Sequence, residues 1–436
     1  MFKKCIVLGI YLLLLSPIST LATLNNRLEI NANFCNNQYD LLIITPDYFV
    51  SELQDLKNHK EQHGISTIIV TLDEIYNGKY FDKIGQDTAE EIKYFIKNSY
   101  DTWNISYVLL MGGSAVIPIR RCNTIPFEDV PVDFTSELYY ADIYDKQFNF
   151  SSWDSDNDGL FCEWYNLSGA EDSHQDLIPE VGLGRFPCYD IDEVHDIVHK
   201  IINYESNSAA SSWFNTMVVA GGETFVQFEG LEGEINTQRA LDIMSDFNPV
   251  KLWYSNGNLG RIGFSILKAI SQGCGFMYFV GHGNSHSWAT LNPEGETLSI
   301  FTILHVPFLS NKNEYPVCLL SGCHVCKIEK SYNLGWVLTK NDNKGAIATI
   351  GPTNIGYYGF EYNGGGLDWL ELQFFREYKK GTTIIGDIWK QALTEFAKEF
   401  PIDWSIPAGV NCAIDAKMAQ EWVLIGDPSL KIGGYD

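Results

Sequence analysis

Basic residues are scarce in this chain of 436 residues: 30 Lys and Arg stand against 55 Asp and Glu, a formal net charge of −25. Binding to nucleic acid without regard to sequence requires a basic face that attracts phosphates, so this composition argues against a nucleic-acid partner. The same charge argues against an anionic membrane surface as a partner. Acidity by itself excludes no class of enzyme.

Long apolar runs are missing after the first residues. Lys3 and Lys4 precede the apolar run Cys5–Leu15, and small residues follow it, which is typical of an export signal over residues 1–22. This run is too short for a spanning helix, and no later stretch is long and apolar enough to be one. We therefore expect a secreted or extracytoplasmic protein whose mature chain has no membrane span.

The cysteine count is odd once the export signal is removed, because Cys5 leaves with it and nine cysteines remain. Exported proteins tend to pair their cysteines, so one free thiol and up to four disulfides fit this count. The pairing itself stays open at this point.

The length of the chain predicts more than one packed unit, since a single simple core seldom extends over so many residues. Short apolar runs, each of strand length, alternate with helical patterns, which predicts parallel strands covered by helices. We therefore expect an α/β fold of two subdomains, each a mostly parallel sheet flanked by helices. The expected segments are a linker or pro-segment remnant over 23–38, an N-terminal subdomain over 39–210 and a catalytic subdomain over 211–436.

An acidic loop interrupts the N-terminal subdomain. Asp154, Asp156 and Asp158 alternate along the chain and precede Gly159, a pattern that turns several carboxylates toward one hard cation such as Ca²⁺. The pattern departs from an EF-hand loop, because the nearest following acid, Glu163, comes two residues too early for the usual last ligand. We predict a structural calcium ion held by these four acids and no organic cofactor; a solvated acidic turn is the alternative.

Two apolar strand-like runs of the catalytic subdomain end in small residues and then in a reactive side chain. His282 follows Phe276–Val280 and Gly281, and Cys323 follows Val317–Leu320 and two small residues. Parallel neighbouring strands bring their carboxyl ends to one edge of a sheet, so the thiol and the imidazole are expected side by side as a nucleophilic pair. The two residues are 41 positions apart, which leaves room for one crossover and its helix.

Five ordered segments resemble the gingipain-type cysteine peptidases, family C25 of the caspase- and legumain-like clan. They extend over nearly the whole mature chain: YDLLIITPDYFV from Tyr39, PEVGLGRFP from Pro179, VGHGNSHSW from Val280, PVCLLSGC from Pro316 and IGDPSL from Ile425. The resemblance implies a cysteine endopeptidase with caspase-like subdomains that hydrolyses proteins or peptides. The oligomeric state stays open.

The resemblance also implies roles for individual residues. Cys323 would attack the scissile carbonyl as a thiolate, and His282 would protonate the leaving amine. Backbone N–H groups of Gly283 and Cys323 would bind the oxyanion, and Glu223 would orient the imidazole.

Substrate preference follows from the same resemblance. Members of the family that cleave after Arg or Lys carry an acid eleven residues beyond the orienting Glu, and Glu234 occupies that position here. A basic P1 residue is therefore predicted, although Glu229 and Glu232 lie close enough in sequence to take this role instead. Trp288, at the end of the His segment, is predicted to be a second substrate-binding residue.

Cys326 departs from the family pattern and keeps other interpretations open. It could form a disulfide with Cys323, or the C-x-x-C pair could serve redox chemistry or join His282 and His286 in a Cys₂His₂ zinc site. A further alternative is a catalytically inactive secreted binding protein on the same scaffold.

Overall fold

The computed structural model describes residues 38–124, 133–164, 169–357, 366–408 and 411–436. The predicted export signal over 1–22, the linker up to residue 37 and Cys35 lie outside the described residues. Within the described part of the chain, no helix combines the length and the apolar character that crossing a bilayer requires.

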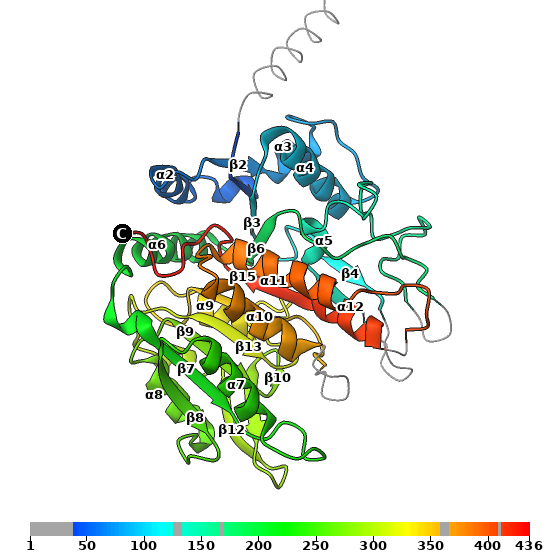
Figure 1. Cartoon of the computed structure of the whole chain (residues 1–436). Helices are drawn as coiled ribbons and strands as arrows, with labels where there is room; N and C mark the ends of the chain where they lie inside the picture. Colours follow the sequence, from blue (N-terminus) through cyan, green and yellow to red (C-terminus); the bar gives the residue numbers. More distant parts are fainter. Residues whose placement is uncertain (1–37, 125–132, 165–168, 358–365, 409–410) are drawn as a thin grey trace, which may run out of the picture.

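A single ten-stranded sheet forms the centre of the molecule (Figure 1). The order of its strands in space is β2 (Thr67–Thr71), β1 (Leu41–Thr45), β3 (Tyr107–Met111), β6 (Gly182–Phe186), β15 (Trp422–Ile425), β14 (Ala348–Pro352), β13 (Val317–Ser321), β9 (Phe276–Val280), β7 (Thr216–Gly221) and β8 (Asn248–Trp253). Several of these strands, β1, β9 and β13 among them, are buried along their whole length. Such runs of apolar residues are typical of parallel strands that helices cover on both faces.

The two predicted subdomains share this sheet instead of forming two sheets. Strands from the two halves meet where β15 pairs with β6, in parallel, through Ile425 and Arg185. On its other side β15 pairs with β14, and this is an antiparallel pair in an otherwise parallel sheet. The expected α/β fold class and its mostly parallel arrangement are confirmed.

Helices cover both faces of the sheet. On α10 (Leu367–Lys379), Glu371 accepts a hydrogen bond from Tyr278 of β9. On α9 (Leu334–Thr339), the Thr339 hydroxyl hydrogen bonds to that of Thr349 on β14. In β13, the strand between β9 and β14, Leu319 is opposite Tyr278 and Cys318 is opposite Thr349. Consecutive residues of a strand face opposite ways. The helices α9 and α10 therefore lie on opposite faces of the sheet. The α-helices of the described residues are α2 (Gln54–Gln62), α3 (Leu72–Tyr76), α4 (Thr88–Trp103), α5 (Leu138–Ala141), α6 (Ile191–Asn207), α7 (Glu232–Ile243), α8 (Phe264–Ile270), α9 (Leu334–Thr339), α10 (Leu367–Lys379), α11 (Ile385–Glu399) and α12 (Asn411–Glu421).

The connection between β9 and β13 differs from the expected helical crossover. It begins with a small antiparallel sheet made of β10 (His282–Asn284), β11 (Ser287–Leu291) and β12 (Thr297–Thr302). A short 3-10 helix, Val306–Phe308, completes it. Gly295 adopts a φ of +80° at the turn between β11 and β12, where a residue with a side chain would be strained. Alternating polar and apolar residues on either side of this turn favour a hairpin over a helix.

A buried ionic cluster joins α2 and α6 to the IGDPSL segment near the C-terminal end. The Lys60 ammonium lies 2.8 Å from Glu205 Oε2 and 2.8 Å from Asp427 Oδ2, and all three side chains are buried. His59 adds a 2.9 Å contact between its Nε2 and Glu205 Oε2. Burial alone would lower the pKa of Lys60, but Asp427 and Glu205 raise it above its ordinary value. The cluster therefore stays ionised inside the protein and links segments that are far apart in sequence.

Candidate active site

The register of β9 and β13 brings His282 and Cys323 to the same level of the sheet. The two strands are parallel neighbours, and Val280 is opposite Ser321 at their carboxyl ends. His282 and Cys323 each follow two residues later, so the predicted adjacency of the two strands is confirmed. Both reactive residues are only partly buried, which leaves them accessible at this edge.

Two glycines let the strand ends approach each other closely. A Cβ atom on Gly322 would lie 3.0 Å from the carbonyl carbon and oxygen of His282 and 3.1 Å from the Gly283 nitrogen. A Cβ atom on Gly283 would lie 2.8 Å from the Cys323 carbonyl oxygen. The two backbones therefore pack directly against each other, with no space for a side chain between them.

The imidazole of His282 is oriented by a backbone carbonyl. Its Nε2 atom lies 2.8 Å from the carbonyl oxygen of Thr224, which follows β7, and the Phe225 ring stands edge-on to it at 6.0 Å between centroids. A carbonyl oxygen only accepts, so Nε2 carries the proton of this bond. Nδ1 has no hydrogen-bond partner among the residues that the structure describes, and it is the nitrogen left for proton exchange.

Glu223 is buried beside this carbonyl but does not hydrogen bond to the imidazole in the described part of the chain. Its Oε1 atom accepts hydrogen bonds from the N–H groups of Thr224 and Phe225, both at 3.0 Å. Oε2 of Glu232, the first residue of α7, lies 3.2 and 3.3 Å from the same two nitrogens. Burial, followed by the neighbouring Glu232 carboxyl, raises the pKa of Glu223 to about 7.

The Cys323 thiol lies in a partly buried setting that keeps it protonated. Burial raises its pKa, and the Gly356 N–H acts in the opposite direction through a hydrogen bond to the sulfur. The buried pair Lys417 and Glu421 on α12 has two opposed effects on the thiol, since the ammonium lowers the pKa and the carboxylate raises it. A base is therefore needed to generate the thiolate.

Cys326 is separated from Cys323 and belongs to the core. Its side chain is fully buried, and Cβ atoms built on Gly335 and Gly351 would lie 2.5 and 3.0 Å from its sulfur. All eight cysteines of the described residues are free thiols, so the predicted disulfides are absent there. Six of the eight are buried, where a thiol packs as a small apolar group.

The zinc alternative is wrong because Cys326 is buried in the core. His286 is exposed in the turn between β10 and β11, whereas Cys326 points into the core. Among the described residues, the side-chain groups that are close enough to hold a metal ion include neither cysteine of the C-x-x-C pair. The four proposed ligands therefore do not converge on one ion.

The two predicted substrate-binding residues have different surroundings. Glu234 is buried on α7, and its carboxylate accepts hydrogen bonds from the backbone N–H, at 2.8 Å, and the hydroxyl of Ser255, just beyond β8. Trp288 is fully buried, with its ring 5.3 Å from that of Phe279 between centroids. The prediction that Trp288 contacts substrate is therefore corrected, because its ring is part of the core.

Three of the four predicted calcium ligands gather in the acidic loop. Carboxylate oxygens of Asp154, Asp156 and Asp158 lie within 4.8 Å of one another, and a second such group joins Asp156 to Glu163 and Glu171. Asp154 also accepts hydrogen bonds from the N–H groups of Asp158 and Gly159, both at 3.1 Å, which hold the turn. Oxygen atoms at this spacing fit the coordination shell of Ca²⁺.

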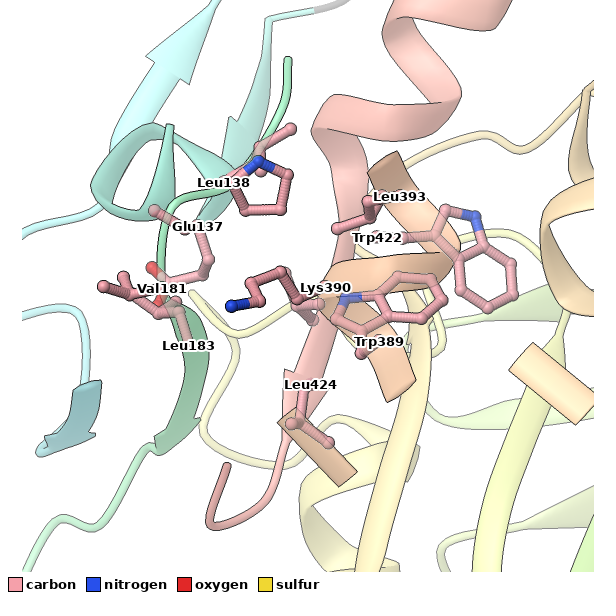
Figure 2. A pocket seen from close by; sticks show the side chains of 12 residues that line it. Glu137, Leu138, Val181, Leu183, Trp389, Lys390, Leu393, Trp422 and Leu424 are labelled. Atoms are coloured by element: carbon pink, nitrogen blue, oxygen red, sulfur yellow. The ribbon is translucent and has the colours of Figure 1, made fainter. Parts of the chain in front are cut away.

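A cavity elsewhere in the molecule is too small to be a ligand site. It has a volume of about 20 Å³ and lies between α5, β6, α11 and β15. Figure 2 shows Leu138, Val181, Trp389 and Leu424 around it, so its wall is largely apolar. This volume suffices for about one water molecule.

Sequence reasoning missed Thr224 and Glu232 as parts of the site. Thr224 acts through its carbonyl oxygen, which every residue type carries, so no residue pattern identifies it. The sequence predicted Glu232 only as an alternative to Glu234. The one available signal was the pairing of two acids nine residues apart, with Gly230 in the segment between them.

The fold and the site together define a class of proteins in which an α/β sheet carries a thiol and an imidazole on adjacent parallel strand ends. The model of peptidase family C25 matches residues 35–433. The chain therefore belongs to peptidase family C25, as its sequence segments predicted.

Several known proteins are similar to this chain. Gingipain R2 of Porphyromonas gingivalis is 21% identical over 290 residues, which cover 65% of this chain and 32% of that protein. An uncharacterised protein of Archaeoglobus fulgidus is 21% identical over 352 residues, covering 72% of this chain and 75% of the other. The crystal structure of the Arg-specific cysteine proteinase gingipain R matches with a TM-score of 0.67 at 17% identity, over 91% of this chain and 78% of that one. This last likeness shows the fold alone, and the chain spans about a third of the length of gingipain R2.

Proposed function

We propose that this protein is a cysteine endopeptidase that hydrolyses peptide bonds in proteins with Cys323 as nucleophile and His282 as base. The observation that carries the proposal is the register of β9 and β13, with Gly283 and Gly322 allowing the two strand ends to touch. Membership of a cysteine peptidase family supports the same reaction class.

The reaction follows from the groups present. The Cys323 thiol transfers its proton to Nδ1 of His282, and the resulting thiolate forms a bond to the scissile carbonyl carbon. The N–H groups of Gly283 and Cys323 are the proposed donors to the oxyanion. The imidazolium then protonates the amine as the C–N bond breaks, and water hydrolyses the thioester to release the acid and restore the thiol.

A catalytically inactive binding protein is less well supported. Such a protein would not require a thiol and an imidazole at matched positions, or a glycine on each strand end to bring them together. The chemistry of the site therefore favours turnover.

A basic P1 residue is the proposed preference, with Glu234 as its acid. A carboxylate accepts up to about four hydrogen bonds and Ser255 occupies two, so Glu234 retains capacity for a guanidinium or an ammonium group. Similar proteins named for Arg or Lys specificity support this assignment.

Cleavage of a mixed-P1 fluorogenic peptide library, with Ca²⁺ and a reducing agent present, tests both points. Wild type is expected to favour Arg or Lys at P1, and Glu234→Gln is expected to lower kcat/KM for these peptides by about tenfold or more. Glu229→Gln, an equivalent change at an exposed position, should leave the profile unchanged. A neutral preference in wild type would contradict the role of Glu234. No turnover by a fully reduced protein would contradict the peptidase proposal itself.

We also propose that a calcium ion is held by Asp154, Asp156, Asp158 and Glu163, with Glu171 as a further ligand, and that it stabilises the acidic loop. The buried Asp172 supports this role, because it links the loop by accepting hydrogen bonds from the backbone N–H groups of Ser155 and Glu163. Burial raises the pKa of Asp172 to about 6, although these two N–H donors oppose the rise. A bound cation would relieve the repulsion between the acids.

Millimolar Ca²⁺ is expected to raise the thermal midpoint of the protein by several degrees, and chelation should reverse the change. Asp156, the acid shared by the two carboxylate groups, is the residue to change, and Asp156→Asn should abolish the shift. Glu294→Gln, which removes one charge at an exposed turn, should keep it. A midpoint in wild type that does not respond to Ca²⁺ would contradict the site. Differential scanning fluorimetry provides the measurement.

Export is the remaining part of the proposal. The pattern over residues 1–22 supports it, and a protein that degrades other proteins is compatible with a place outside the cytoplasm. The partners are then protein or peptide substrates met there.

A further inference from the structure

The imidazole of His282 and two buried carboxyl groups lie at opposite ends of one peptide unit. The Thr224 carbonyl oxygen, at one end, is 2.8 Å from Nε2 of His282. The Phe225 nitrogen, at the other end, is 3.0 Å from Glu223 Oε1 and 3.3 Å from Glu232 Oε2. The C=O and N–H of a trans peptide point in opposite directions, so the peptide bridges the carboxyl groups and the imidazole.

Negative charge at the N–H end of this peptide strengthens its carbonyl as an acceptor. Hydrogen bonds linked through one peptide unit polarise each other, and more so in a buried setting. Glu223 and Glu232 are both buried, 4% and 3% exposed, so solvent screens their charge little. The charge thus acts on the imidazole through the peptide, without direct contact.

The two carboxyl groups also constrain each other. Both lie within hydrogen-bond distance of the same Thr224 and Phe225 nitrogens, at 3.0 to 3.3 Å. Two carboxylates in one buried site ionise together only at high cost, which favours a proton shared between them. The raised pKa of Glu223, about 7, is consistent with this shared proton.

We propose that Glu232 is a positioning residue of the peptidase, which with Glu223 forms a single-proton carboxyl pair that fixes and polarises the Thr224–Phe225 peptide and thereby orients His282 and stabilises its imidazolium form. The inference rests on the proposed function and adds to it a residue that acts through others. It also explains how Glu223 influences the imidazole although no hydrogen bond joins them.

In the described part of the chain, groups that face the pair come from α7, from His282 and from β11. On α7 the next acid is Glu234, which is engaged by Ser255, and across the peptide the titratable group is His282 itself. From β11 the contact is uncharged: the Thr290 hydroxyl donates to the Glu223 carbonyl oxygen at 3.0 Å. Glu229, in the loop before α7, is exposed. We therefore assign any effect of pH that reaches the His282 imidazole through this peptide to the carboxyl groups of Glu223 and Glu232.

Two substitutions of Glu232 distinguish the effect of its charge from the effect of its size and hydrogen bonding. Glu232→Gln keeps a side chain that can hydrogen bond to Glu223 but cannot ionise. Glu232→Ala removes both the hydrogen-bonding group and the charge. We expect Glu232→Ala to lower kcat about 10- to 100-fold with KM nearly unchanged, since misplacement of a base has effects of this size. Glu232→Gln should restore kcat to within about threefold and lower the pKa of His282 by about half a unit to one unit.

The experiment combines kinetics with a direct titration of the imidazole. Peptide turnover is measured for wild type, both Glu232 variants and Glu229→Gln as the exposed control. The His282 ring is titrated by NMR with ¹³C-labelled histidine in a Cys323→Ala background, and its resonance is assigned by its loss in His282→Ala. Unchanged kinetics in Glu232→Ala, or the same His282 pKa with Glu and Gln at 232, would overturn the proposal.

The two proposals fail in distinguishable ways. If wild type shows no turnover, the peptidase reaction is refuted, yet the titration still decides whether the pair acts on His282. If Glu232→Ala does not fold, the titration of Glu232→Gln alone is decisive. A loss of kcat that Glu232→Gln does not restore, with an unshifted His282 pKa, would make Glu232 merely structural and would also overturn the inference.

Discussion

Cys323→Ala is expected to reduce peptide turnover by about a thousandfold or more, while the protein keeps its fold. The reason is that the described residues offer no second accessible thiol at the site: Cys326, three residues away, is fully buried with its sulfur against two glycines. Oxyanion donors and His282 would remain, but they can only assist water, which leaves a small residual rate. Turnover of the preferred library peptide by the reduced enzyme gives the measurement.

The matched control is Cys412→Ala. Cys412 and Cys323 are the two partly exposed cysteines in the described part of the chain, so both substitutions remove an accessible thiol. Only the change at Cys323 should affect turnover, and only that variant should resist labelling by a peptide-based electrophile. Retention of a tenth or more of the wild-type rate by Cys323→Ala would disprove its role as nucleophile.

Lys60→Met is expected to lower the free energy of unfolding by about 3–5 kcal/mol, the usual effect of removing one member of a buried ionic cluster. The substitution leaves Glu205 and Asp427 facing each other without a cation in a fully buried site. Two carboxylates in that position must protonate or separate, and either change costs stability. Urea unfolding followed by tryptophan fluorescence measures the difference.

Lys398→Met serves as the control for that experiment. Lys398 pairs with Glu395 at 3.0 Å, but its side chain is 58% exposed, and surface pairs contribute at most about 1 kcal/mol. A Lys60→Met protein as stable as the control would show that the cluster is not important for stability. A stability loss with normal kcat would separate the cluster from the catalytic site.

The sheet was predictable wherever the strands are buried on both faces. The runs that became β1, β3, β9 and β13 are apolar except for the last residue of β1 and of β13, and this pattern identified each of them. β8, Asn248–Trp253, was missed because it is an edge strand with exposed and half-buried residues, which leaves no continuous apolar run. The hairpin after His282 was missed because its two longer strands, Ser287–Leu291 and Thr297–Thr302, are partly exposed and form no continuous apolar run.

The site was predictable only in the parts that depend on residue type and strand position. His282 and Cys323 were predicted because two apolar strands end in small residues followed by a reactive side chain. The pairing of β9 with β13 then brings the two residues to the same level. The environment of Glu223 does not follow from sequence, because its contacts are backbone nitrogens and a carboxyl from the next helix. Trp288 shows the reverse error, in which a residue within a family segment proved to be part of the core.

The position of β15 has a consequence for the order in which the molecule is completed. This strand is the last one along the described chain, yet it lies in the middle of the sheet, between β6 and β14. Its pairing joins Ile425 to Arg185, residues 425 − 185 = 240 positions apart, and such distant contacts form slowly. During synthesis, the strands that lead to His282 and Cys323 therefore emerge from the ribosome before the strand that joins the two halves. A nascent chain halted before Trp422 would carry both reactive side chains on a sheet still divided in two.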